Sequence, residues 1–229
     1  MTIINKIIDG KMYAEKLLKE IHPLSKEFLH NFNRKPCLTV ILVGDNPASK
    51  IYVKNKILVA KKIDIETREI LLSSDITEDE LIKHISILNK DQNVDGILVQ
   101  LPLPKHISEK KIINLISPLK DVDGFHPKNF GKLFMGDPKF IPCTPLGCLY
   151  MLKQEIEDIK GKNAVIIGRS NIVGKPMASL LLSSDCSVTI THSKSKNIEE
   201  YTRKADILIV AVGIPEMIDE KFIKPGAIV

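Results

Sequence analysis

Nearly continuous apolar runs alternate along this chain with segments in which apolar residues recur every three or four positions. The runs are rich in Val, Ile and Leu, and polar residues rarely interrupt them. Such strands are typical of parallel sheets that are covered on both faces. The amphipathic segments between the runs predict the connecting helices. We therefore predict an α/β fold with parallel sheets.

The first half of the chain carries clear start signals for its helices. Pro47 suits the first turn of a helix, Thr77 and Glu80 form a capping box, and Ser108 can cap a third helix. The predicted strands span 38–44, 66–72 and 94–104, and the predicted helices span 47–63, 77–88 and 108–116. We interpret the region from Pro118 to Pro145 as a loop that separates two α/β units.

The same alternation resumes after this loop. The pattern predicts helices at 144–156, 172–184 and 197–205, strands at 162–168, 187–191 and 206–213, and the beginning of a strand at 224–229. The two predicted domains are residues 1–140 and 141–229, with a cleft between them. The order of strands and helices makes the second domain Rossmann-like.

Composition and length narrow the class of protein. The chain has 229 residues, of which 44% are hydrophobic and 27% charged, as in an ordinary globular protein with one large or two small domains. It has no signal-peptide pattern and no apolar run approaching the ~18 residues of a membrane span. Its four cysteines show neither Cys-x-x-Cys pairs nor zinc spacing. We expect a cytoplasmic protein with no bound metal and no membrane partner.

A net charge of +5 and a pI near 8.9 raise the question of nucleic-acid binding. The lysines are scattered among acidic residues, and no basic run is interleaved with aromatic residues. We therefore expect no nucleic-acid partner. A small anionic ligand, or solubility alone, explains the charge equally well.

The segment "VIIGRSNIVGKP" (165–176) predicts a phosphate-binding turn between a strand and a helix. Gly168 allows a tight turn, and Gly174 allows close packing at the start of the helix. Arg169 and Ser170 follow Gly168, so the second glycine of the usual dinucleotide fingerprint is missing and the next glycine is Gly174. Two glycines between a strand and a helix are also found in ordinary turns, so further features are needed.

The next strand supplies those features. It leads into His192 and Ser193, followed by Lys194, Ser195 and Lys196, where an NAD-binding protein carries an acidic residue for the ribose. Hydroxyl groups and cations favour a 2′-phosphate, and Arg169 adds a planar guanidinium. We therefore predict NADP as the cofactor. The third strand ends in Gly213, which suits a close approach to the nicotinamide half.

Polar residues of the first half form a second candidate constellation. Tyr52 and Lys56 are four residues apart and share one face of a predicted helix, and Gln100 stands at the end of a strand, where α/β sheets bind ligands. Asp121 and Asp123 lie in a Gly-Pro-rich loop. Taken singly, each is also explained as a solvated lysine, a satisfied glutamine or a turn-forming aspartate.

Seven segments, in this order, resemble one family. They are "YVKNK", "DGILVQLPLP", "KDVDGFHPKNFGKL", "PCTPLG", "VIIGRSNIVGKP", "VTITHSKS" and "ADILIVAVG". From about residue 3 to residue 229, the chain is similar to the bifunctional methylenetetrahydrofolate dehydrogenase/methenyltetrahydrofolate cyclohydrolases. The resemblance implies NADP-dependent oxidation of 5,10-methylenetetrahydrofolate and hydrolysis of the methenyl product to 10-formyltetrahydrofolate. It also implies a homodimer and a place in one-carbon metabolism, which serves purine, methionine and histidine biosynthesis.

The resemblance assigns a role to each candidate residue. Lys56 is the catalytic lysine, Gln100 its polar partner, Tyr52 the residue that stacks on the folate, and Asp123 the pterin anchor. Further folate-site positions are Val99, Leu101 and Pro102. Cofactor-site positions are Gly168, Arg169, Ser170, Val173, Gly174, His192, Ser193, Val212 and Gly213. The chemistry agrees with these roles, because hydride transfer needs mainly positioning, whereas hydrolysis needs a group that takes or polarises a proton of water.

Two alternatives remain open at this stage. Family members are expected to continue for about 50 residues beyond residue 229, which would complete the parallel sheet. The chain is therefore also compatible with a truncated or degenerate member that binds NADP or folate without turnover. The other alternative is a dehydrogenase of similar build for another small anion, although "DVDG" and "VQLPLP" have no evident task there.

Overall fold

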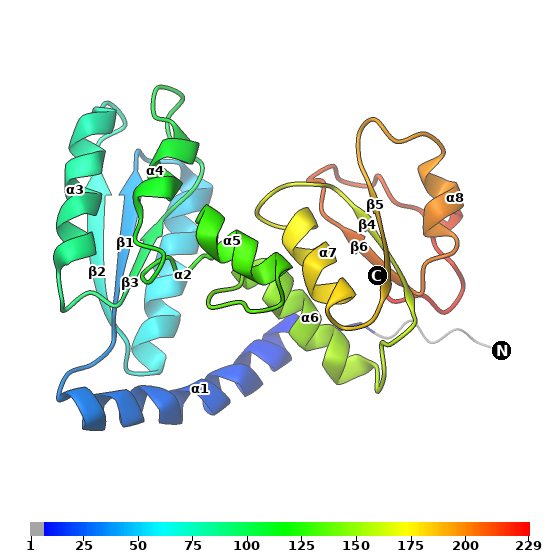
Figure 1. Cartoon of the computed structure of the whole chain (residues 1–229), viewed down its shortest axis with the longest axis horizontal. Helices are drawn as coiled ribbons and strands as arrows, with labels where there is room; N and C mark the ends of the chain where they lie inside the picture. The colour runs from blue at the N-terminus through cyan, green and yellow to red at the C-terminus, as the bar shows by residue number, and fades with distance from the viewer. Residues whose placement is uncertain (1–6) are drawn as a thin grey trace. The chain divides into compact units, whose positions relative to one another are not determined.

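Two three-stranded parallel sheets organise the chain, one in each of two units, Met1–Pro127 and Lys128–Val229 (Figure 1). The structure is a computed structural model and describes residues 7–229. Residues 1–6, in which the resemblance and the predicted first domain begin, lie outside the described residues. The predicted α/β class with parallel sheets is confirmed, whereas the cleft between the units stays a prediction.

The elements of the first unit are α1 (Gly10–Phe32), β1 (Cys37–Val43), α2 (Pro47–Lys62), β2 (Glu66–Leu72), α3 (Glu78–Lys90), β3 (Gly96–Val99) and α4 (Glu109–Leu115). Those that follow are α5 (Pro127–Phe134), α6 (Cys143–Glu155), β4 (Asn163–Ile167), α7 (Gly174–Leu182), β5 (Ser187–Thr191), α8 (Ile198–Thr202), β6 (Ile207–Val210) and the short 3₁₀ helix η1 (Glu220–Phe222).

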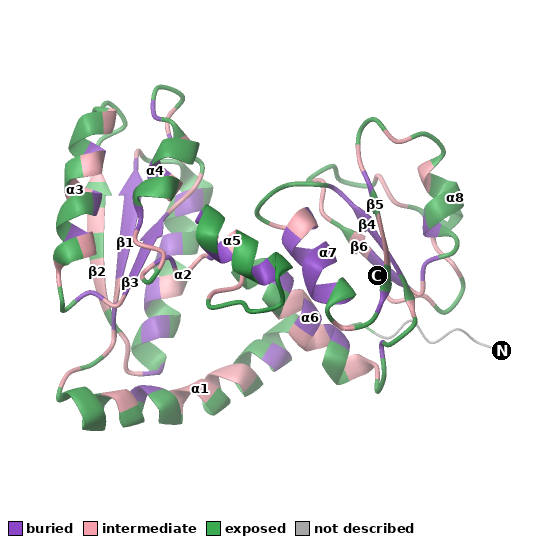
Figure 2. Cartoon of the chain, viewed as in Figure 1, coloured by how far each residue is buried: buried purple, intermediate pink, exposed green. Residues whose placement is uncertain are grey.

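In the first unit β1 is the central strand, and the strand order is β2-β1-β3. Helices cover both faces of this sheet, so consecutive residues of β1 enter two different cores. Val40 and Leu42 pack with Val53 and Ile57 of α2. The alternate residues of β1, including Ile41, pack with apolar residues of α3 and α4. Figure 2 shows the central strand β1 buried, whereas the helices around it carry exposed residues. This explains why β1 is continuously apolar.

The predicted helix starts are confirmed. Pro47 lies in the first turn of α2, and the side chain of Asn46 accepts a hydrogen bond from the Ser49 amide. Thr77 and Glu80 form both bonds of the capping box at α3. Ser108 caps α4. Within residues 7–229, no helix is both long enough and apolar enough to cross a membrane.

The second unit repeats the plan with the strand order β5-β4-β6. Ala164 and Ile166 of β4 face a core shared with α6 and α7. Val165 and Ile167 face the opposite core, which includes Leu208 of β6. The crossover from β4 through α7 to the parallel strand β5 is the unit from which Rossmann-like sheets are built.

Several sequence-based expectations about the elements were wrong. The strand expected at 206–213 ends at Val210, because the Ala211 amide makes the last ladder bond, to the Ile167 carbonyl. The strand expected at 94–104 ends at Val99, because Gln100 makes the last ladder bond to the Ile41 carbonyl and prolines at 102 and 104 have no N–H to continue. The loop expected at 118–145 contains α5, whose Leu133 is buried in a core. The strand expected at 224–229 is reduced to a single bridge involving Ile228. Helix α1 was not predicted.

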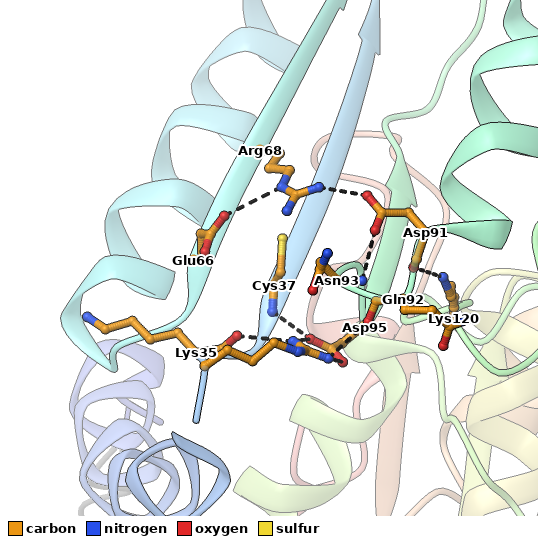
Figure 3. Close-up of polar contacts among 10 residues, drawn as sticks. Lys35, Cys37, Glu66, Arg68, Asp91, Gln92, Asn93, Asp95 and Lys120 are labelled. Carbon is orange, nitrogen blue, oxygen red and sulfur yellow. Dashed lines mark hydrogen bonds and ion pairs between the residues drawn. The ribbon is translucent and has the colours of Figure 1, made fainter. Parts of the chain in front are cut away.

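Ion pairs and hydrogen bonds stabilise the end of the first sheet at which its strands begin (Figure 3). Asp95 accepts two hydrogen bonds from Arg34 and one from the Cys37 amide. The Arg34 guanidinium holds the pKa of Asp95 below its ordinary value. Burial raises the pKa of the Cys37 thiol, which keeps it protonated and unreactive. This edge is therefore structural, and the candidate chemistry lies at the opposite edge.

Candidate functional site

Lys56 and Gln100 meet at the carboxyl edge of the first sheet. Lys56 lies on α2, which follows β1, and Gln100 directly follows β3. The Lys56 ammonium donates a hydrogen bond of 3.0 Å to Oε1 of Gln100. Nε2 of Gln100 in turn donates a 2.7 Å hydrogen bond to the Leu101 carbonyl. This second bond fixes the amide so that its oxygen faces the lysine.

Tyr52 precedes Lys56 by one helical turn. Val53 and Ile57 fix the rotation of α2 by burying their side chains against the sheet. Tyr52 is 62% exposed, whereas Lys56 is half-buried. The tyrosine ring is therefore free of the core and available for stacking on a flat ligand.

Asp123 belongs to the same locality. Its carboxyl group is half-buried, and burial raises its pKa to about 6, with the negative charge of Asp121 acting in the same direction. The positive charge of Lys56 opposes this rise. The structure thus brings Lys56, Gln100 and Asp123 into one electrostatic neighbourhood. A carboxylate whose pKa is raised in this way is a common feature of functional sites.

The remaining folate-site candidates differ in their exposure to solvent. Val99 is 5% exposed, and its side chain lies in the core shared with α3 and α4. Leu101 is half-buried beside that core, and Pro102, which follows a cis peptide bond, is exposed. Contacts of these three residues with substrate stay predictions.

Asp121 was a candidate beside Asp123 in the sequence, but the family resemblance gave it no site role. Asp121 is 2% exposed, and its carboxylate accepts hydrogen bonds from the amides of Phe125 and His126. The signal was present in the sequence, since an aspartate ahead of a glycine favours a turn closed by its own side chain. Its burial beside Asp123 was not visible there.

The turn after β4 in the second unit has room only for glycine at two positions. Gly168 has φ +119°, and a Cβ there would lie 2.4 Å from the Ala211 carbonyl oxygen. A Cβ on Gly174 would lie 2.2 Å from the Gly168 carbonyl oxygen. Strand, turn and helix therefore approach one another more closely than any side chain allows. A close approach of strand, turn and helix is typical of phosphate-binding turns in dinucleotide-binding proteins.

Ser170 and Arg169 differ in what they do within this turn. The Ser170 hydroxyl accepts hydrogen bonds from the amides of Val173 and Gly174, so it shapes the entry into α7. Arg169 is exposed. Lys175 donates a 2.7 Å hydrogen bond to the Asn171 side chain within the same turn. An arginine and a lysine thus flank the predicted phosphate site.

A compact turn follows β5. The His192 amide donates to the Ser195 hydroxyl at 3.0 Å, and the His192 ring accepts from the Lys194 amide at 3.1 Å. Ser193, Lys194 and Lys196 are exposed, and no carboxylate occurs between Thr191 and Asn197. The local charge is positive, which suits a phosphorylated ribose.

The end of β6 completes the set of cofactor candidates. Val212 is half-buried against the core, and the exposed Gly213 has φ +52°. No side chain or backbone atom stands within 4 Å of a Cβ built on Gly213. Among the described residues, no cluster of His, Cys, Asp or Glu could hold a metal ion.

Comparison with known proteins gives a consistent result for both units. Residues 8–123 match the family described as tetrahydrofolate dehydrogenase/cyclohydrolase, catalytic domain, and residues 142–229 match its NAD(P)-binding domain. The bifunctional protein FolD of Wolbachia sp. subsp. Drosophila simulans is 53% identical over 100% of this chain and 78% of its own length.

Solved structures agree with this match. The FolD methylenetetrahydrofolate dehydrogenase/cyclohydrolase of Campylobacter jejuni has a TM-score of 0.92 and 45% identity, covering 96% of this chain and 78% of that chain. The Trypanosoma brucei enzyme, complexed with NADP and an inhibitor, has a TM-score of 0.91 and 31% identity, covering 96% and 75%.

Proposed function

The chain belongs to the tetrahydrofolate dehydrogenase/cyclohydrolase family, and from this premise we propose that it interconverts one-carbon derivatives of tetrahydrofolate. It oxidises 5,10-methylenetetrahydrofolate to 5,10-methenyltetrahydrofolate with NADP, and it hydrolyses the product to 10-formyltetrahydrofolate. The observation that carries this proposal is the hydrogen bond between Lys56 and Gln100 beside Asp123.

The second unit fits NADP. The close packing of Gly168 and Gly174 forms a cradle that a single Cβ would fill. Arg169 and Ser193 are exposed beside the turns that follow β4 and β5, where they would hold the 2′-phosphate. When bound, NADP supplies a hydride acceptor. The absence of a carboxylate after β5 favours NADP over NAD, because a carboxylate would repel the extra phosphate.

In the first unit, Tyr52 and Asp123 orient the folate. We assign the exposed ring of Tyr52 to stacking on the pterin and the ionised carboxylate of Asp123 to accepting hydrogen bonds from N3–H and the 2-amino group. Oxidation needs no strong base, because the two nitrogens flanking the reacting carbon supply electrons as the hydride leaves. Positioning is therefore the main contribution of these residues to the first reaction.

Lys56 acts in the hydrolysis. Water adds to the carbon between N5 and N10 of the methenyl cation and must lose a proton as the new C–O bond forms. We assign to Lys56 the task of taking that proton as the neutral amine, or of polarising the attacking water. Gln100 holds the lysine through a neutral amide oxygen, which orients Nζ without adding a negative charge. The N5–C bond then breaks as the added hydroxyl loses its proton to form the carbonyl and N5 gains a proton, and the formyl group remains on N10.

The dehydrogenase for another small anion, considered from the sequence, is not supported, because both units match the folate family.

We further propose that the protein is a cytoplasmic homodimer, as the family resemblance implies. Its four cysteines form no disulfide, which suits a reducing compartment. Light scattering coupled to size-exclusion chromatography tests the dimer, which a monomeric mass would contradict.

The direct test is to incubate the purified chain with 5,10-methylenetetrahydrofolate and either NADP or NAD, and to identify the folate product. We expect 10-formyltetrahydrofolate to appear with NADP and much more slowly with NAD. A folded chain that binds NADP and forms neither product would contradict the proposed activity of this polypeptide and favour binding without turnover.

A further inference from the structure

The loop that carries Asp123 is joined to the first sheet rather than free of it. The Ile97 amide of β3 donates a 2.8 Å hydrogen bond to the Lys120 carbonyl, and Ile97 forms a parallel bridge with Asp121. The loop therefore begins as a one-residue extension of the sheet beyond β3. Asp123 stands two residues after this point.

Two contacts hold the loop on either side of Asp121. The Lys120 ammonium donates to the carbonyls of Leu88 and Asp91 at 2.8 and 2.6 Å, at the last turn of α3. Val122 packs directly over Gly96, where an added Cβ would lie 2.5 Å from the Val122 side chain. Cationic side chains at a helix C-terminus stabilise its unpaired carbonyls.

Asp121 closes the turn from within. Its carboxylate accepts hydrogen bonds from the Phe125 amide at 3.3 Å and from the His126 amide at 2.8 Å. Its carbonyl accepts a 3.2 Å hydrogen bond from the amide of Gly124, which has φ +67°. The turn that presents Asp123 is thus folded around a buried negative charge.

That charge also acts on Asp123. In the described part of the chain, Lys56 of α2 and Asp121 of the loop are the charged groups that act on the Asp123 carboxyl. Burial is the main cause of its raised pKa, Asp121 adds to the rise, and Lys56 opposes it. Removing the charge of Asp121 therefore makes Asp123 ionise at a lower pH.

We propose that Asp121 is a positioning residue for folate binding, whose buried carboxylate fixes the turn that presents Asp123. This inference rests on the proposed folate-binding role of Asp123. Asp121 itself need not touch the substrate. Lys120 serves the same purpose by anchoring the start of the turn.

The test compares Asp121→Asn with the matched control Asp9→Asn. Asp9 also accepts backbone amides, from Lys11 and Met12, but it caps the start of α1. Steady-state kinetics over a pH series give kcat and the KM values for 5,10-methylenetetrahydrofolate and NADP. Well above pH 6, we expect Asp121→Asn to raise the folate KM roughly tenfold with an unchanged KM for NADP. The rise in folate KM on acidification should move to lower pH.

Asp121→Asn kinetics indistinguishable from those of Asp9→Asn would overturn the proposal. If Asp121→Asn does not fold, the KM values of Lys120→Gln for folate and NADP test the proposal instead. A raised folate KM with an unchanged NADP KM supports the anchored turn, and an unchanged folate KM refutes it.

A measurement without substrate separates this inference from the proposed function. Carbon-13 NMR of the aspartate carboxyl groups follows the titration of Asp123 directly. A lower titration midpoint in Asp121→Asn supports the inference even if the wild-type chain shows no turnover, in which case the proposed activity alone fails. An unchanged midpoint contradicts the proposed charge effect.

Discussion

Replacing Gly174 by alanine tests the second unit at its tightest point. The added Cβ would lie 2.2 Å from the Gly168 carbonyl oxygen and 2.7 Å from its carbonyl carbon. An ordinary carbon–oxygen contact is about 3.4 Å, so the turn must move away from α7 by roughly 1 Å. Both atoms belong to the backbone, and no side-chain rotation can relieve the clash.

The cost follows from this displacement. Overpacking of a tight interior costs about 2 kcal/mol. For a unit of this size, each kcal/mol corresponds to a fall in Tm of several degrees, so the second unit should unfold roughly 10 °C lower. NADP binding should weaken more than about tenfold, because amides displaced by about 1 Å no longer reach the phosphates with good geometry.

Two assays and one control complete the design. Thermal unfolding followed by circular dichroism gives the Tm, and calorimetric titration gives the Kd for NADP. Gly147→Ala is the matched control, since a Cβ there meets nothing within 4 Å and alanine favours the interior of α6. It should bind NADP normally and be slightly more stable. Wild-type Tm and Kd in Gly174→Ala would refute the close-packing argument.

Three further predictions concern the first unit. Lys56→Met should lose hydrolysis of the methenyl cation by at least about a hundredfold while retaining NADP affinity, and equal loss of both in a folded variant would contradict the assigned role. In the wild type, the folate KM should rise as pH falls through about 6, because protonation removes the carboxylate of Asp123; Asp123→Asn should abolish this dependence in a pH series. Asp95→Ala should lower the free energy of unfolding in urea by about 1–2 kcal/mol, with no change in NADP affinity, because the bonds to Arg34 and to the Cys37 amide are lost. Since the pKa of Asp95 is lowered in the folded protein, its stabilisation is present at neutral pH and disappears as acid protonates it, and an equal loss of stability at every pH would contradict this account.

The parts of the fold that depend on local pattern were predictable. Strands β1, β2 and β5 lie within one residue of their predicted bounds. For β1 the reason is that both of its faces are buried, which makes the strand a nearly continuous apolar run. The caps at Thr77 and Ser108 need only neighbouring residues. Helix α5 was missed because glycine and proline dominate its surroundings, although Asn129 and Leu133 are buried at helical spacing.

The parts that depend on distant neighbours were not predictable from spacing alone. The face shared by Tyr52 and Lys56 follows from helical periodicity, but the contact between Lys56 and Gln100 spans 44 residues. It requires β3 to lie next to β1, which the strand order β2-β1-β3 provides. The family resemblance supplied this pairing, and the structure supplied its distance. The burial of Asp121 likewise depends on the bridge to Ile97.

The anchorage of Lys120 on α3 has a consequence for local fluctuations. Opening of the last helical turn would withdraw the carbonyls of Leu88 and Asp91 from the ammonium, and the loop bearing Asp123 would lose one of its attachments. The opening equilibria of the helix end and the loop are therefore coupled. A substitution that frays the end of α3 would therefore lower the affinity for folate without touching the folate site. The stability of this helix end contributes to folate affinity by keeping the loop of Asp123 in place.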